Sequence, residues 1–160
     1  MKLRILSIGT KMPKWVDTGF AEYHKRIQPM LTTEMVDLPA SKRAKNPSEA
    51  NLASYREQEG QSLLTAHPNG AKLWVLDVKG KIISTETLAD KLSNAMLEGD
   101  DISLVIGGAD GVSPDVINRA DFVWSLSKLT LPHPLVRVVL MEQLYRAMSI
   151  NHNHPYHRGN

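Results

Sequence analysis

Three glycines lie within five residues in the segment Gly107-Gly108-Ala109-Asp110-Gly111, which follows an apolar run at residues 101–106. Glycine tolerates positive φ and has no Cβ, so such a turn lets a ligand approach bare backbone. The spacing differs from the G-x-G-x-x-G of dinucleotide-binding proteins, and the segment after the first apolar run (residues 9–12) does not supply that motif either. The cluster therefore indicates either a ligand-binding loop of another kind or an ordinary tight turn.

Pro132 and Pro134 bracket His133 just before a long apolar segment. Proline fixes φ and has no N–H, so we expect an extended stretch whose other N–H and C=O groups are free to bind the edge of a ring such as adenine. Histidine can also transfer protons near neutral pH. The alternative is a loop that leads into a helix and carries a surface histidine.

The last ten residues contain three histidines, His152, His154 and His157, together with Tyr156 and Arg158. No Cys, Asp or Glu accompanies them, so a metal site is disfavoured. Tyrosine and arginine can stack on a base or hold a phosphate, which suits RNA. The alternative is a disordered polar end.

The segment at residues 135–150 is apolar around most of a helical circumference. A helix of that kind is buried on several sides, so we expect it to cover its own sheet and to pack against a second copy of the chain. Glu142 and Arg146 are four residues apart and can pair across one turn, either as a buried pair or as a surface pair of little energetic weight.

Segments with strand-like and helical patterns alternate along the chain. The expected strands are residues 2–8, 32–38, 72–78, 101–106 and 122–126. The expected helices are residues 15–28, 48–65, 84–98, a segment that begins at 113–115, and 135–150. Ser48 is expected to cap the second helix, and Pro114 fits the first turn of the fourth.

Strand–helix alternation predicts one α/β domain, residues 1–160, with a mainly parallel sheet covered by helices on both faces. Ligands of such sheets bind outside the carboxyl ends of the strands. That rule selects the loops at residues 9–14, 79–83, 107–113 and 128–134.

The chain has 160 residues, a formal net charge of +2 and no cysteine. The absence of cysteine excludes disulfides, thiolate metal sites and cysteine nucleophiles. The small net charge means that any nucleic-acid surface must be local, and residues 41–46 form a basic loop. With no signal peptide or long apolar run in the sequence, we expect a cytoplasmic protein that does not enter a membrane.

Six segments together resemble the bacterial large-subunit ribosomal RNA methyltransferase H family, which belongs to the SPOUT superfamily of S-adenosylmethionine-dependent methyltransferases. Each segment alone is a weak signal, but all occur in order over essentially the whole chain. They are GTKMPKWV (9–16), PASKRAKN (39–46), LDVKGK (76–81), SLVIGGADG (103–111), SLSKLTLPHPLVRVVLMEQLYRA (125–147) and NHPYHR (153–158).

The resemblance implies a SPOUT fold with a deep C-terminal trefoil knot, a homodimer, and methyl transfer to N3 of a pseudouridine in 23S rRNA within the ribosome. It implies three cofactor loops, and no metal is needed. The implied S-adenosylmethionine-binding residues are Leu76, Gly107, Gly108, Ser127, Lys128, Leu129, Thr130, Leu131 and Pro132.

Methyl transfer to N3 requires that the hydrogen on that nitrogen leave, so a base and a cation for the developing imide anion are needed. The candidates are His133, Arg146, Tyr156, His157 and Arg158. Which histidine acts as base stays open, as does whether the tail serves its own chain or a second one. Two other functions also stay open: a non-catalytic RNA-binding module and a methyltransferase that acts on tRNA.

Overall fold

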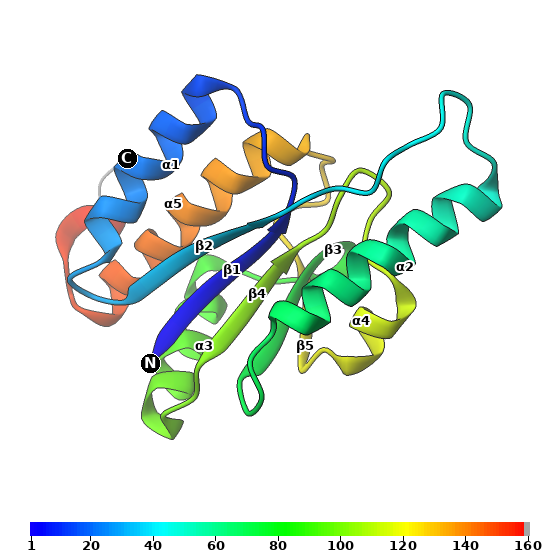
Figure 1. Ribbon diagram of the computed structural model, residues 1–160. Coiled ribbons are helices and arrows are strands. Elements are labelled where there is room, and N and C mark those ends of the chain that lie inside the picture. Colours follow the sequence, from blue (N-terminus) through cyan, green and yellow to red (C-terminus); the bar gives the residue numbers. More distant parts are fainter. Residues whose placement is uncertain (159–160) are drawn as a thin grey trace.

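The computed structural model describes residues 1–158, and these form one five-stranded sheet with helices on both faces (Figure 1). All pairings are parallel, in the order β2-β1-β4-β3-β5. The strands are β1 (Lys2–Ile8), β2 (Thr32–Leu38), β3 (Lys72–Ile82), β4 (Ile102–Ile106) and β5 (Phe122–Ser125). The helices are α1 (Lys14–Ile27), α2 (Glu49–Ala66), α3 (Thr85–Glu98), α4 (Pro114–Arg119) and α5 (His133–Asn151), followed by the 3₁₀ turn η1 (Pro155–Arg158).

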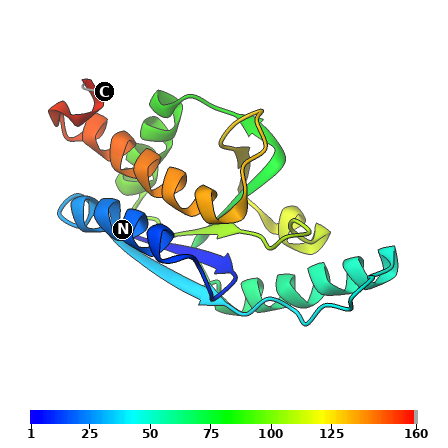
Figure 2. The ribbon, with the colours of Figure 1, turned by 90° about the horizontal axis from the view of Figure 1, so that it is seen from above.

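Each strand supplies a side chain to either face in turn, because successive residues of a strand point in opposite directions. In β1, Leu3 and Ile5 pack with α1, α3 and α5, whereas Leu6 and Ile8 pack with α2 and α4. Every residue of the middle strand β4 is buried. Figure 2 shows the two helical layers on opposite sides of the sheet. The predicted parallel sheet with helices on both faces is confirmed, and the knot stays a prediction.

Helix starts follow the predicted capping chemistry. Ser48 and Asn51 form a reciprocal capping box at α2, and Ser84 accepts a hydrogen bond from the backbone N–H of Thr87 at α3. Ser113 caps α4 in the same way, with Pro114 in its first turn. These side chains satisfy N–H groups that a helix cannot pair internally. The starts of α2, α3 and α4 are therefore set locally, whereas α1 and α5 begin after Pro13 and Pro132 without a side-chain cap.

The predicted loop at residues 79–83 is wrong for most of its length, because β3 continues to Ile82. After a break in register between Leu76 and Lys81, the strand pairs again with Trp124 and Ser125 of β5. Gly80 permits this return: a Cβ there would lie 2.5 Å from the backbone carbonyl carbon of Trp124. A strand passing so close to another backbone requires glycine.

Replacing Gly80 by alanine is therefore expected to separate the end of β3 from β5. Such overpacking costs about 2 kcal/mol, which lowers Tm by roughly 4–8 °C for a chain of this size. Thermal unfolding followed by circular dichroism measures the change. Lys81→Ala, an exposed position on the same strand, serves as the control. An unchanged Tm for Gly80→Ala would contradict the close approach.

Candidate active site

One cavity of about 1100 Å³ opens at the carboxyl ends of β3, β4 and β5. Its size is that of a site for a cofactor or drug-sized ligand. Its walls come from the middle of β3, from the segments after β4 and β5, from α4, from the first turn of α5 and from one residue of α2. The lining residues are Arg56, Leu76, Asp77, Val78, Lys79, Ile106, Gly107, Gly108, Ala109, Asp110, Gly111, Val112, Pro114, Ile117, Asn118, Val123, Ser125, Leu126, Ser127, Leu129, Thr130, Leu131, Pro132, His133 and Val136.

Every predicted cofactor-binding residue except Lys128 lines this cavity. His133 is the one candidate catalytic residue among its walls, and the predicted loop at residues 9–14 contributes none. Three of the four loops that the strand-end rule selected line the cavity. They are residues 107–113, residues 128–134 and, through Lys79, residues 79–83. Whether these residues bind a cofactor stays a prediction.

The segment between β5 and α5 has the free backbone that an adenosine group needs. Ser125 and Ser127 hold it in shape: the Ser125 hydroxyl donates to the Ser127 carbonyl at 2.9 Å, and the Leu129 N–H donates to the Ser127 hydroxyl at 2.9 Å. Within residues 1–158, the N–H groups of Thr130 and Leu131 have no protein acceptor. Because leucine side chains and free N–H groups line one wall, the cavity fits the apolar face and polar edge of an adenine ring.

The two glycines of the turn after β4 are required by packing within the chain. A Cβ on Gly107 would lie 2.6 Å from the Val112 side chain, and one on Gly108 would lie 2.7 Å from Oε1 of Glu59. A side chain at Gly108 would therefore displace a buried carboxylate. A substitution there is a poor probe of ligand contact, since lost binding and a distorted turn would look alike.

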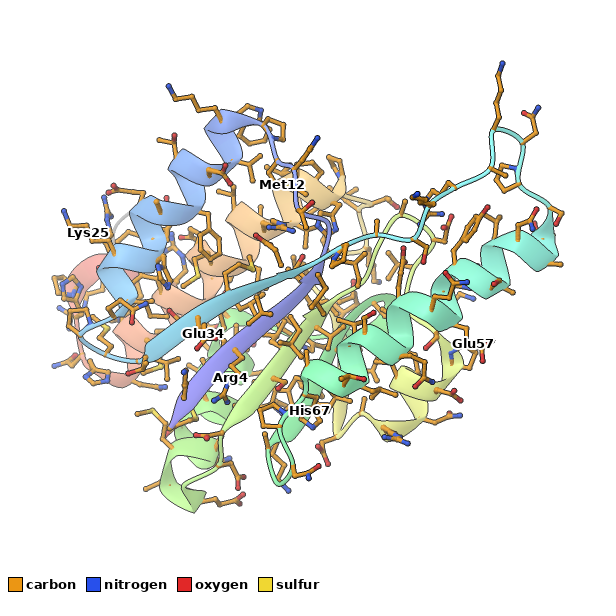
Figure 3. All side chains as sticks on the ribbon, in the orientation of Figure 1. Arg4, Met12, Lys25, Glu34, Glu57 and His67 are labelled. Carbon is orange, nitrogen blue, oxygen red and sulfur yellow. The ribbon has the colours of Figure 1, made fainter. Side chains whose placement is uncertain are left out.

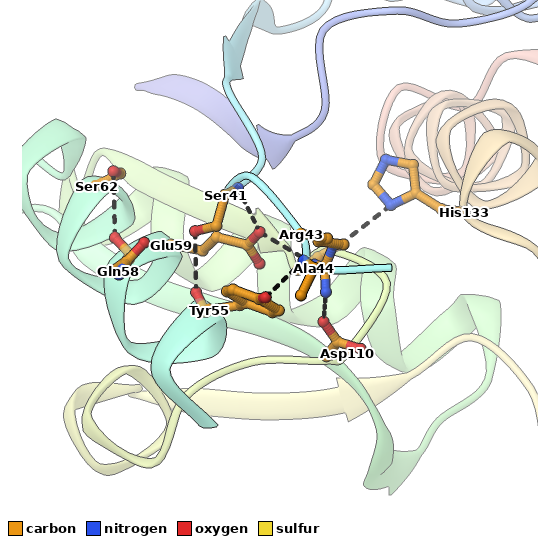
Figure 4. Close-up of polar contacts among 10 residues, drawn as sticks. Ser41, Arg43, Ala44, Tyr55, Gln58, Glu59, Ser62, Asp110 and His133 are labelled. Carbon is orange, nitrogen blue, oxygen red and sulfur yellow. Dashed lines mark hydrogen bonds and ion pairs between the residues drawn. The ribbon is translucent and has the colours of Figure 1, made fainter. Parts of the chain in front are cut away.

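An arginine of the basic loop fastens the glycine turn to α2 (Figure 4). Arg43 forms ion pairs with Asp110 of the turn and with Glu59 of α2, the latter at 3.2 Å. Glu59 also accepts the N–H of Ser41 at 2.9 Å, and the Arg43 guanidinium lies 5.1 Å from the ring centre of Tyr55. The loop at residues 41–46 and the cavity wall are thus joined by one side chain. The sequence indicated only that this loop is basic, and it gave no sign that Arg43 pairs with Asp110 and Glu59.

Both ring nitrogens of His133 are engaged inside the protein. Nδ1 lies 3.1 Å from the carbonyl oxygen of Gly107, and Nε2 accepts from Nε of Arg137 at 3.2 Å. The hydroxyl of Ser7 lies 3.4 Å from the same Nε2. Burial lowers the pKa of His133, and the positive charge of Arg137 lowers it further.

The buried side chain of Arg137 connects α5 to the carboxyl ends of β1 and β2. Its guanidinium donates to the Asp37 carboxylate of β2 at 2.7 Å and to the carbonyl of Gly9 at 2.6 Å. Only 4% of the residue is exposed. Sequence reasoning gave it no role, although a charged residue inside a helix that is apolar nearly all round indicates a buried partner.

The remaining catalytic candidates gather along the C-terminal half of α5. Glu142 accepts hydrogen bonds from Arg146 at 2.8 Å and from the hydroxyl of Tyr156 at 2.8 Å. The predicted Glu142–Arg146 pair is thus confirmed. Burial raises the pKa of Glu142, but the hydrogen bonds from Arg146 and Tyr156 outweigh burial and lower it. Burial, followed by the bond to Glu142, raises the pKa of Tyr156, so its hydroxyl keeps its proton here.

The tail is ordered as a 3₁₀ turn against α5 rather than a disordered end, and the last two residues lie outside the described part of the chain. Arg146, Tyr156, His157 and Arg158 do not line the cavity. Glu142, to which the Tyr156 hydroxyl binds, lies nine residues after His133 in α5, which is about 14 Å along the helix axis. A single chain therefore brings His133 to the predicted cofactor residues but leaves the other four candidates at a second location.

Residues 1–158 lack two kinds of structural feature. They contain no group of three or more His, Cys, Asp or Glu side chains placed to hold a metal ion. None of their helices combines the length and the apolar character needed to cross a bilayer.

Comparison with known proteins gives one consistent result. The family model described as "Predicted SPOUT methyltransferase" matches residues 1–157. The protein "Ribosomal RNA large subunit methyltransferase H" of Psychrobacter sp. (strain PRwf-1) is 80% identical, with all of both chains covered. The protein of the same name from Acinetobacter baumannii is 58% identical over 99% of this chain and all of its own.

Solved structures resemble the fold at much lower identity. A methylase family protein from Haemophilus influenzae Rd KW20 has a TM-score of 0.53 at 12% identity and covers 96% of this chain and 69% of its own. A methylase family protein from Neisseria gonorrhoeae has a TM-score of 0.51 at 13% identity, with 90% and 81% covered. At such identities the likeness shows the fold alone.

Proposed function

Since the chain belongs to the ribosomal RNA large subunit methyltransferase H family of SPOUT methyltransferases, we propose that residues 1–160 act as one domain that methylates N3 of a pseudouridine in 23S rRNA within the ribosome, with S-adenosylmethionine as donor. The observation that carries the proposal is the cavity at the ends of β3, β4 and β5, whose walls contain nearly all residues that the family pattern assigns to the cofactor. An rRNA substrate also favours a cytoplasmic location.

S-adenosylmethionine, when bound, supplies a methyl group on a positively charged sulfur that a nucleophile can attack directly. The chain must then hold the uracil ring in line with that methyl and accept the N3 proton. Leu76, Leu131 and the free N–H groups of Thr130 and Leu131 would hold the adenosine portion. The turn at Gly107 and Gly108 would form the opposite wall.

The substrate half of the site is incomplete in one chain, since the tail packs on the C-terminal half of α5 and does not line the cavity. We therefore place Tyr156, His157 and Arg158 in the cavity of a second copy, in a two-fold dimer built on α5. In that arrangement His157 is the candidate base, and Arg158 or Arg146 offsets the charge on the deprotonated ring. An RNA-binding module without a catalytic role would have no use for the adenosine-sized cavity.

Isothermal titration with S-adenosylmethionine tests the cofactor site. The wild-type chain should bind saturably, and Leu131→Ala should bind about tenfold more weakly, because a buried leucine contact is worth about 1.4 kcal/mol here. Leu97→Ala removes the same side chain from an exposed position of α3 and should change nothing. Absence of binding by the wild-type chain at millimolar ligand would contradict the enzyme assignment.

Methyl transfer to ribosomes that lack the modification, with tRNA offered in parallel, tests the substrate. The proposal expects radioactive methyl only in 23S rRNA. Label in tRNA alone would assign the chain to another substrate class.

A further inference from the structure

The hydrogen-bond partners of His133 fix the state of its ring. A guanidinium has only donors, so the nitrogen that contacts Arg137, Nε2, must present its lone pair. A carbonyl oxygen only accepts, so Nδ1, which faces Gly107, must carry the hydrogen and donate it. The two contacts therefore define one neutral tautomer, with Nδ1 protonated and Nε2 bare.

The lone pair of His133 points into the protein. Nε2 lies between Arg137 and the hydroxyl of Ser7, and a Cβ on Gly9 would lie 3.9 Å from it. Protonation at Nε2 would bring a new positive charge against a guanidinium that is itself buried. The charged groups that face the ring are Arg137 from α5 and Asp37 from β2, and Asp37 is occupied by Arg137.

We propose that His133 is a positioning residue and not the base of the proposed methyl transfer: its Nδ1–H holds the Gly107 carbonyl, and so the glycine wall of the cavity, against the start of α5. The proposal rests on the proposed function and narrows it, because the proton of the substrate must then be taken by another group. His133 acts through Gly107, whose turn continues to Asp110 and the Arg43 ion pairs. The histidine and the arginine thus hold the same turn from two sides.

Asparagine separates the two roles of the side chain. Its amide nitrogen occupies nearly the position of Nδ1 and can donate to the Gly107 carbonyl, but it has no basic lone pair. His133→Ala should raise the KM for S-adenosylmethionine about tenfold with a much smaller change in kcat, and His133→Asn should recover most of that loss. His67→Ala is the matched control, because it removes a histidine–serine hydrogen bond (to Ser103 at 2.8 Å) at the C-terminal end of α2 (Figure 3).

Equal loss of kcat in the alanine and asparagine variants, with normal cofactor binding, would identify His133 as the base and overturn the proposal. A second measurement uses the wild-type chain and does not depend on the folding of a variant. ¹⁵N NMR of the imidazole rings should show His133 at neutral pH with Nδ1 protonated and Nε2 bare, and its pKa should lie below that of free histidine. A ring that titrates near neutral pH would also overturn it. If the wild-type chain methylates nothing, the proposed function fails, while NMR and cofactor titration still decide the role of His133.

Discussion

Deletion of residues 153–160 should reduce methyl transfer to ribosomes by about a thousandfold or more, the combined contribution of a positioned base and a cation. Affinity for S-adenosylmethionine and dimer formation should stay close to those of the full chain. The reason is spatial: within one chain the tail packs on the C-terminal half of α5 and contributes no cavity wall. Its loss removes proton transfer and substrate contacts, whereas all residues that line the cavity remain.

Mixed dimers reveal which chain the tail serves. The tail-deleted chain retains its cavity, and a Leu131→Glu chain, with a carboxylate in the cavity wall, retains its tail. If the tail acts on the partner's cavity, a mixture regains roughly a quarter of the full rate, since half of the dimers are mixed and each has one complete site. If the tail serves its own chain, the mixture stays inactive. Full activity of the deletion alone would show that the tail is dispensable.

Arg137→Met should be the most destabilising single substitution proposed for this chain. It removes the arginine donor from Asp37 and from the Gly9 carbonyl at once, and it leaves Nε2 of His133 with only the Ser7 hydroxyl. The Gly9 carbonyl loses a charged donor, whereas the Asp37 carboxylate, whose side chain is 40% exposed, can turn to water. The loss should be about 3 kcal/mol, which lowers Tm by roughly 6–12 °C. Urea unfolding and calorimetry measure the loss.

Two further arginine variants serve as an intermediate case and as a control for Arg137→Met. Arg137→Lys retains the charge but cannot reach three acceptors in one plane, so its loss should be intermediate. Arg119→Met, an exposed position of α4, should change the stability by less than about 0.5 kcal/mol. A Tm for Arg137→Met within a degree of the wild type would show that the hydrogen bonds and the ion pair of Arg137 contribute nothing to the stability of the fold.

The elements could be predicted from sequence because hydrophobic period and capping residues are local signals. β1 and β2 match the predicted bounds, and Ser48, Ser84 and Ser113 cap the expected helices. The continuation of β3 could not be predicted, since it depends on backbone contact between Gly80 and Trp124, more than forty residues along the chain.

The cavity walls could also be predicted, because glycine and proline mark the loops and the strand-end rule places them together. The roles of charged side chains could not. Nothing local indicates that Arg137 meets Asp37, a hundred residues earlier, or that Arg43 meets Asp110, sixty-seven residues later. The contact of Arg137 with His133 determines which ring nitrogen carries the hydrogen, and it follows from the fold alone. The sequence therefore left the base undecided.

The place of β1 in the sheet has a consequence for synthesis. Its second neighbour, β4, begins at Ile102, so one edge of an apolar strand stays unpaired while some ninety further residues are made. Unpaired strand edges recruit other chains. Parallel sheets with such distant partners also fold slowly, because the connecting loop must close first. We therefore expect the nascent chain to be most prone to aggregation before β4 emerges, above all during rapid overproduction.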